Sequence, residues 1–359
     1  MYFDFKQEYE RFKEFILFDK LIGKNVVALG GSFSSGKSSF LNSLLDEEIL
    51  PSDITPSTSV PAYIINNSET SVYGINTFES VITIQPEEVS MIAHGFGKDD
   101  SDGKEVTLGH LLKSLFIALP KQPFRHIALL DTPGYSKSDN DGYSYKTDEK
   151  IARTQLNSAN FILWFVTADS GTITNSDIDF LKSLNPEIPK LIILNKADKI
   201  FPDELDEVVT KIRDILKMKD IKFLDVLTYS SEDPDDYDKD KILEYIGKWD
   251  NAVAESRFAY NFKVLFTKCK EYYEELLLEH RKYKSRISKS TAYADHDFVI
   301  TFLTELDKNV TDEMKDLRKM IETLNKLQFE FFSEVYRISL KVGIKMPEPT
   351  EIDLIDDRM

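Results

Sequence analysis

The spacing of apolar residues changes twice along this chain of 359 residues, and each stretch predicts a different kind of element. Residues 3–22 repeat aromatic and aliphatic side chains about once per helical turn, which predicts an amphipathic helix. Between residues 24 and 247, short β-rich apolar runs alternate with helical segments. Runs that are apolar on both faces are typical of a mainly parallel sheet covered by helices on each side. The predicted strands are 25–29, 60–65, 126–130, 161–166, 191–194 and 223–227.

Strand signals stop after Trp249. Residues 252–288 and 297–341 contain almost no Gly or Pro and predict two long helices. At about 1.5 Å per residue each helix reaches roughly 55–65 Å, so an antiparallel hairpin is expected, with the N-terminal helix as a third member of the bundle. The insert before the third strand is interpreted as one extra strand, at 80–84, and an acidic loop, at 97–103. We therefore expect an α/β domain at 23–248, a helical bundle formed by 1–22 and 249–346, and a polar tail at 347–359.

Composition narrows the class of protein. The chain has 62 acidic and 45 basic side chains, a formal charge of −17, and −15 of this lies in residues 1–250. Nucleic acid binding through bulk charge is therefore excluded, because phosphate contacts need a basic face. The single cysteine, Cys269, excludes a disulfide framework. No signal peptide or spanning apolar segment is present, so we expect a cytoplasmic protein that meets a membrane only peripherally, at its inner face.

The strongest chemical signal is an eight-residue motif, G-x-x-x-x-G-K-[ST], between a predicted strand and a helix that begins near Ser39. In that context the backbone N–H groups of the loop surround a β-phosphate at a helix N-terminus. Lys37 is expected to bridge the β- and γ-phosphates, and the Ser38 hydroxyl to bind Mg²⁺. The motif consists of Gly31, Ser32, Phe33, Ser34, Ser35, Gly36, Lys37 and Ser38.

Two further motifs follow later strands. Asp131-Thr-Pro-Gly134 supplies a carboxylate that holds Mg²⁺ through water and a backbone N–H for the γ-phosphate. Asn195-Lys196-Ala-Asp198 suits guanine, because the carboxylate of Asp198 accepts two hydrogen bonds that adenine cannot donate. Asn195 would hold the loops together, and the stem of Lys196 would cover the base. The chain is therefore predicted to bind GTP rather than ATP.

Two weaker signals complete the predicted site. Ser230 and Ser231 follow the last strand, where a backbone N–H would meet guanine O6. Between the phosphate loop and Asp131, Thr58 is a candidate for a mobile Mg²⁺ ligand whose carbonyl orients the attacking water. Thr55 and Ser57 are rivals at this spacing.

Together these motifs resemble the dynamin superfamily, and more closely its bacterial dynamin-like branch. The resemblance covers about residues 24–235 and rests on 31–45, Leu50-Pro51, 58–61, DTPG and NKAD. It implies a large GTPase, often acting on membranes, whose GTPase domains dimerise face to face across the nucleotide. The partner would be a second copy or a related dynamin-like protein.

The resemblance also implies how catalysis works. A K⁺ or Na⁺ ion near the β–γ bridge would be held with help from Ser34, Lys37 and Ser38 would serve the phosphates and Mg²⁺, and Thr58 would place the water. Phe33 stands where eukaryotic dynamins carry Gln, and Tyr135 follows Gly134 where Ras carries its water-orienting Gln. We therefore expect slow basal hydrolysis that rises with self-association.

The helical region leaves alternatives open. The basic segment 280–289 is either a solvated helix end or a contact for anionic lipid. Apolar residues within 329–340 suit a bundle core, or else a groove for a partner. Two function classes follow: a GTP-hydrolysing mechanochemical enzyme on membranes, or a GTP-dependent switch or scaffold for a protein partner. The sequence stops soon after residues 347–349, so we expect either an excised fragment of a longer protein or a minimal member of the family.

Overall fold

The computed structural model describes residues 2–50, 60–89, 112–135, 144–254 and 256–355. The chain forms two compact units, one of residues 7–257 and one of residues 1–6 with 258–359. The division falls inside the first helix, α1 (Tyr2–Leu17).

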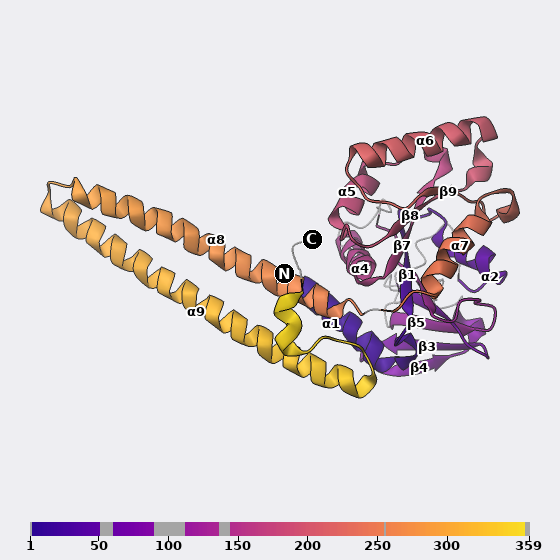
Figure 1. The fold of residues 1–359 in the computed structure, drawn as a ribbon, viewed down its shortest axis with the longest axis horizontal. Coiled ribbons are helices and arrows are strands. Elements are labelled where there is room, and N and C mark those ends of the chain that lie inside the picture. Colours follow the sequence, from indigo (N-terminus) through magenta and orange to yellow (C-terminus); the bar gives the residue numbers. More distant parts are fainter. Residues whose placement is uncertain (1, 51–59, 90–111, 136–143, 255, 356–359) are drawn as a thin grey trace, which may run out of the picture. The chain divides into compact units, whose positions relative to one another are not determined.

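A nine-stranded sheet organises the first unit (Figure 1). The strand order is β4-β3-β5-β2-β6-β1-β7-β8-β9. The strands β6, β1, β7, β8 and β9 are mutually parallel. Strand β2 is antiparallel to β6, and β3 is antiparallel to both β4 and β5. The predicted mainly parallel sheet is therefore confirmed. The strands are β1 (Asn25–Gly31), β2 (Ala62–Asn66), β3 (Ser71–Asn76), β4 (Val81–Ile84), β5 (Leu112–Leu119), β6 (Ile127–Asp131), β7 (Phe161–Thr167), β8 (Lys190–Asn195) and β9 (Val226–Thr228).

The insert between β2 and β6 holds more sheet than predicted. Besides the expected strand β4, it contributes β3 and β5, which the sequence interpretation missed. β3 buries only part of its length, and β5 pairs with β3 on one side and β2 on the other. β5 is an apolar run, with every residue but Lys113 buried, that the sequence interpretation overlooked. The predicted acidic loop at 97–103 lies outside the described residues.

Helices cover both faces of the sheet. Alternate residues of β1 belong to two separate apolar clusters, Val26 and Ala28 to one and Val27 and Leu29 to the other. This alternation explains why the strands are apolar on both faces. Figure 1 shows one layer of helices on each side. One layer contains α4 (Ser144–Ser158), α5 (Asn175–Ser183) and α6 (Pro202–Met218), and the other contains α2 (Lys37–Leu45) and α7 (Lys239–Asp250).

The unit boundaries differ from the predicted divisions after residues 22 and 248. Phe18 is buried in an apolar cluster on the sheet, where its ring lies 4.2 Å from that of Phe116. Trp249 stacks on Phe161 at 4.6 Å, and the side chain of Asn25 donates to the Trp249 carbonyl at 2.9 Å. Aromatic burial on the sheet thus keeps residues 7–22 and 249–257 with the first unit.

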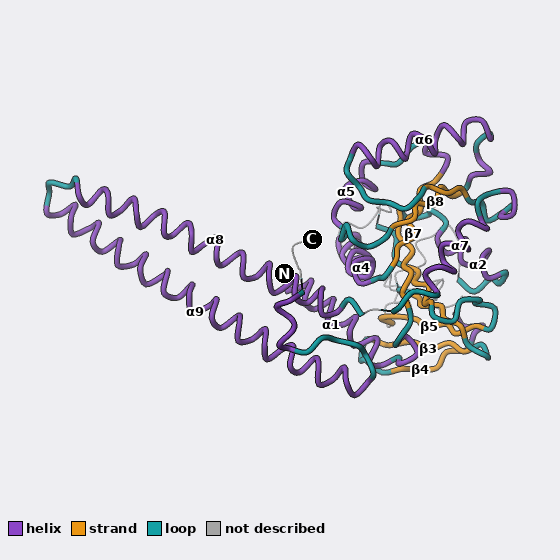
Figure 2. Tube along the Cα trace, in the orientation of Figure 1, coloured by secondary structure: helices purple, strands orange, loops and turns teal. Residues whose placement is uncertain are grey.

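The second unit is a helical hairpin. Helices α8 (Phe258–Ala292) and α9 (Asp297–Val342) run side by side (Figure 2). Phe5, Phe262, Phe266, Phe331 and Phe332 form an aromatic cluster in this unit. The predicted helical region is therefore confirmed. Among the described helices, none is both long and apolar enough to cross a bilayer.

Candidate nucleotide site

The predicted phosphate loop connects β1 to α2. Gly36 adopts the left-handed conformation with φ +85°, and Ser34 does so with φ +58°. A side chain at Gly36 would overlap the side-chain nitrogen of Asn195. Gly31 has no room either, because a Cβ there would lie 2.6 Å from the carbonyl of Phe165. The loop therefore needs glycine at both positions. The predicted order of strand, loop and helix is observed, with Ser32, Phe33 and Ser35 in the loop and Ser39 in α2.

Lys37 begins α2 and is buried. Its Nζ donates to the carbonyls of Ser32, at 3.1 Å, and Gly31, at 3.4 Å. Burial lowers the pKa of Lys37, and the nearby Asp131 carboxylate opposes this shift. Burial likewise raises the pKa of Asp131, opposed by Lys37 and by a hydrogen bond from Ser38. An ammonium and a carboxylate are thus held together in a buried place, which suits the binding of a charged ligand.

The oxygen atoms beside Lys37 fit a magnesium ion. Ser38 Oγ donates to Asp131 Oδ2 at 2.8 Å. Asp131 Oδ1 is buried and has no hydrogen-bond partner among the described residues. Hydroxyl and carboxylate oxygens are the ligands that Mg²⁺ prefers. Ser38 and Asp131 are therefore suitable Mg²⁺ residues, whereas Thr58, with its rivals Thr55 and Ser57, lies outside the described residues.

Gly134 lies against the phosphate loop. A Cβ on Gly134 would lie 2.7 Å from Cα and 2.8 Å from the backbone nitrogen of Phe33. Thr132 Oγ1 donates to the carbonyl of Leu29 at 2.6 Å, in the last part of β1. The second motif is therefore attached to the first by backbone contacts that exclude any side chain at position 134.

The third motif also reaches the phosphate loop. Asn195, at the end of β8, donates from Nδ2 to the carbonyl of Ser35 at 2.8 Å. Lys196 adopts φ +59° and donates from Nζ to the carbonyl of Ser34 at 2.8 Å. Burial is the main cause that lowers the pKa of Lys196. Residues 160 positions apart in sequence are thus in direct contact.

Asp198 lies beside the loop that follows β9. Ser230 Oγ donates to Asp198 Oδ1 at 2.6 Å, and the N–H of Ala197 donates to the Tyr229 carbonyl at 3.1 Å. The Ser231 carbonyl accepts a hydrogen bond from Ser43 in α2, at 3.4 Å. The structure therefore brings all the predicted site residues that it describes to one edge of the sheet, at the carboxyl ends of β1, β6, β8 and β9.

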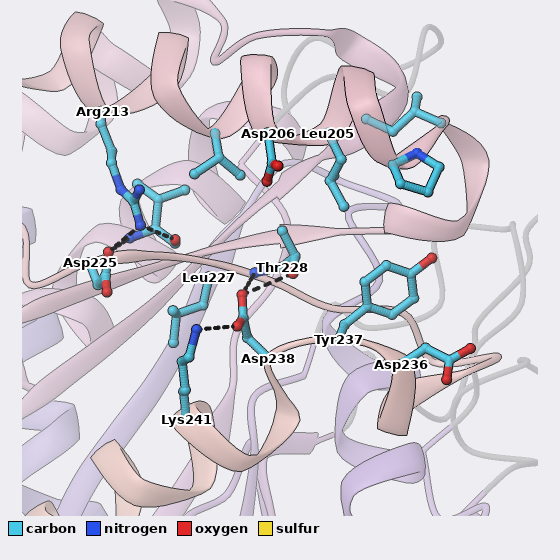
Figure 3. Close-up of a pocket in the computed structure, with 14 residues that line it drawn as sticks. Leu205, Asp206, Arg213, Asp225, Leu227, Thr228, Asp236, Tyr237, Asp238 and Lys241 are labelled. Atoms are coloured by element: carbon cyan, nitrogen blue, oxygen red, sulfur yellow. Dashed lines mark hydrogen bonds and ion pairs between the residues drawn. The ribbon is translucent and has the colours of Figure 1, made fainter.

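A separate cleft of about 640 Å³ lies between α6 and residues 236–241, over the edge strand β9 (Figure 3). Arg213 Nη2 donates to Asp225 Oδ1 at 2.7 Å and to the Val226 carbonyl at 3.0 Å. The N–H of Thr228 donates to Asp238 Oδ2 at 3.0 Å. These contacts satisfy backbone groups along the edge of the sheet and protect it from pairing with another strand. None of the predicted nucleotide residues lines this cleft.

Sequence reasoning missed one contact next to the predicted site. Tyr135 entered only as the residue that stands in place of a Gln, yet it is buried and donates to Asp177 in α5. The one sequence signal for Asp177 is its spacing from Thr174, which is typical of a helix N-terminus. Tyr135 directly follows the DTPG motif, but nothing in the sequence connects Asp177 to the nucleotide motifs.

Comparison with known proteins agrees with this geometry. A sequence profile of the dynamin family matches residues 27–197, and a septin profile matches residues 126–272. Dynamin-like protein 2 of Campylobacter jejuni is 25% identical over 244 residues, which cover 66% of this chain and 37% of that protein. EH domain-containing protein 2 of Rattus norvegicus is 24% identical over 191 residues, 52% of this chain and 32% of that protein. The chain thus spans only about a third of the length of these two relatives.

A similar fold occurs in a solved structure of an oligomerised bacterial dynamin pair described as sensing and tethering membranes. The TM-score is 0.50 at 16% identity, over 91% of this chain and 63% of that one. At this identity the likeness concerns the fold. The sheet and its strand-end motifs define a P-loop GTPase domain. Within that class, residues 27–197 are similar to the dynamin family, and a bacterial dynamin-like protein is among the relatives.

Proposed function

We propose that this chain binds GTP with Mg²⁺ and hydrolyses it to GDP and phosphate, and that association of two GTPase domains raises the rate. One observation carries the proposal: three loops far apart in sequence contact one another directly. Asn195 and Lys196 donate to carbonyls of the phosphate loop, and Ser38 donates to Asp131. Such contact lets one ligand meet the phosphate, metal and base residues at the same time.

The residues have separable roles in this proposal. Lys37 binds the β- and γ-phosphates, the Gly134 N–H donates to the γ-phosphate, and Asp198 accepts from the guanine edge. Mg²⁺ held by Ser38 and Asp131 would neutralise charge on the phosphate oxygens. Thr58 places the attacking water. The loops around the base are completed by Asn195, Lys196, Ser230 and Ser231.

Two residues near the predicted γ-phosphate position support the proposal of activation by self-association. Phe33 has no side-chain polar group, and Tyr135 is buried, so neither orients water. We propose that K⁺ or Na⁺, held with help from Ser34, supplies positive charge near the β–γ bridge once two domains meet. The partner is a second copy or a related dynamin-like protein.

The test is the GTPase rate per molecule, measured against protein concentration in K⁺, Na⁺ and a buffer that contains neither ion. We expect the rate to rise with concentration and to depend on the ion, and Lys37→Ala to be inactive. A rate per molecule that stays constant in all three buffers would contradict activation by association. Preference for ATP over GTP in binding would contradict the base assignment.

We further propose that the helical hairpin brings the enzyme to the inner face of a membrane, from the cytoplasm. Tyr293, in the turn between α8 and α9, is exposed, and so are Phe298 and Phe302 near the start of α9. Lys289 is exposed in the last turn of α8. Exposed aromatic groups beside cations suit the interface of an anionic bilayer. The four residues are called the hairpin tip below.

Sedimentation with anionic liposomes tests this proposal. Phe302→Ser should weaken binding and lower liposome-stimulated GTP hydrolysis, whereas Phe329→Ser should not. The two phenylalanines are a matched pair, since both are on α9 and are 55% and 57% exposed. They are separated by 27 positions, about 40 Å along the helix. Equal effects of the two changes would contradict a role for the hairpin tip.

The alternative function is a GTP-dependent switch or scaffold for a protein partner. It is favoured by apolar side chains that the hairpin leaves uncovered. Phe332 and Val335 are buried, as expected for a bundle core, but Phe329 and Leu340 are exposed. GTP hydrolysis that liposomes leave unchanged, together with loss of partner binding in Phe329→Ser, would favour this alternative over membrane action.

A further inference from the structure

Tyr135 follows the γ-phosphate residue Gly134 directly, and its side chain is buried rather than directed to solvent. Its ring packs against two aromatic neighbours that also contact each other, with ring centroids 5.5 Å from Trp164 and 4.8 Å from Phe180. Its hydroxyl donates to Asp177 Oδ1 at 2.6 Å. The first residue after the DTPG motif is therefore held by both stacking and a hydrogen bond.

Asp177 is equally buried and is held by several donors. Besides Tyr135, Trp164 Nε1 donates to Oδ1 at 3.2 Å. Thr174 donates to Oδ2 from its hydroxyl, at 2.6 Å, and from its backbone N–H, at 3.3 Å. A buried carboxylate needs such donors, because an unpaired one is strongly destabilising. Asp177 is therefore a rigid attachment point at the start of α5.

The opposite side of the same segment lies against the phosphate loop. Gly134 approaches the backbone of Phe33 so closely that no Cβ fits between them. Trp164 approaches Gly30 in the same way, since a Cβ there would lie 2.8 Å from Trp164 Cε3. The backbone of residue 134 is thus confined on one side by the loop and on the other by the anchored ring of Tyr135.

We propose that Tyr135 is a positioning residue for GTP: through Asp177, it holds the Gly134 N–H at the γ-phosphate. This inference rests on the proposed function and goes beyond it, because it assigns a role to a side chain that contacts Asp177, Trp164 and Phe180. The γ-phosphate exists only in GTP. Loss of the anchor should therefore weaken binding of GTP analogues and leave GDP binding almost unchanged. A residue that only fills the core would affect both nucleotides alike.

The test is Tyr135→Phe, which removes the hydroxyl and keeps the ring. Tyr63→Phe is a matched control, because Tyr63 is also buried in the same sheet and donates to a carboxylate, Glu14 Oε2, at 2.8 Å. We expect Tyr135→Phe to raise the Kd for GTPγS about tenfold, the lower end of the range for a hydrogen bond to a charged group. The Kd for GDP should change less than about twofold, and Tyr63→Phe should change neither. Thermal unfolding of both variants reports the purely structural cost.

A double-mutant cycle tests the route through Asp177. Asp177→Asn should also raise the Kd for GTPγS, and adding Tyr135→Phe should raise it no further. Additive effects would overturn this route. If Tyr135→Phe weakens the binding of GTPγS and GDP equally, or changes the binding of neither nucleotide, the inference is wrong. This outcome decides the question even where Asp177→Asn fails to fold. Failure of the unmodified chain to bind either nucleotide would instead contradict the proposed function itself.

Discussion

Gly36→Ala isolates the contact between the phosphate loop and the guanine motif. The change adds one methyl group at φ +85°, where it would overlap Asn195 Nδ2. The left-handed conformation costs a non-glycine residue about 1–2 kcal/mol. Asn195 must also move away, which breaks its 2.8 Å hydrogen bond to the Ser35 carbonyl and leaves a buried group unsatisfied, at about 1–3 kcal/mol. The total is about 2–5 kcal/mol.

Gly23→Ala is the matched control. Gly23 has φ +77°, and nothing lies within 4 Å of the position of a Cβ, so only the backbone cost of about 1–2 kcal/mol applies. The free energy of unfolding, from urea titration followed by fluorescence, should differ between the two variants by about 1–3 kcal/mol. Binding of GTPγS should be impaired only by Gly36→Ala, and in the background of Asn195→Ala the extra stability cost should disappear. Equal stability of the two glycine variants, with normal GTPγS binding by both, would refute the interlocked loops.

Three other changes test separate parts of the site and the fold. Asp198→Asn should weaken GTP binding about 100-fold or more and favour xanthosine triphosphate, because the amide cannot accept from both guanine donors; competition binding with the two nucleotides measures this. Ser38→Ala should raise the Mg²⁺ concentration needed for half-maximal hydrolysis, which a Mg²⁺ titration checks, and an unchanged requirement would remove Ser38 from the metal site. Burial raises the pKa of Glu14 to about 7, and the charge of Arg11 opposes this shift. In an unfolded chain the pKa of a Glu is about 4.3, so the stability that the protonated Glu14 contributes to the fold is lost as the pH rises through 7. Glu14→Gln should therefore remove about 2 kcal/mol of the fall in unfolding free energy between pH 5.5 and 8, and urea titrations of both proteins at the two pH values should show this.

Much of the sheet was predictable because its signals are local. The apolar runs that became β1, β6, β7 and β8 are continuous, and each ends where a motif begins. β3 escaped prediction because it is only partly buried and gains stability from pairing with β4 and β5. The apolar run of β5 was overlooked. The direction of β2, antiparallel to β6, depends on the path of the insert rather than on its own residues.

The residues of the predicted site also differ in how well the sequence alone could assign them. Residues 31–38, Asp131 and 195–198 could be assigned from sequence, because phosphate, magnesium and guanine each require particular groups at fixed spacing. Ser230 was a weak candidate from sequence, and in the structure its hydroxyl donates to Asp198 at 2.6 Å. The role of Thr58 remains a prediction, since this residue lies outside the described part of the chain.

The amino-acid sequence by itself determined which groups are present, the periodicity that forms strands and helices, and the class of ligand those groups recognise. The tertiary structure alone decided which loops meet and what holds them. Asn195 contacts Ser35 across 160 residues, and Tyr135 contacts Asp177 across 42. The physical reason is that both contacts depend on the order of strands in the sheet. That order is selected by the packing of the whole core, and no short stretch of sequence encodes it.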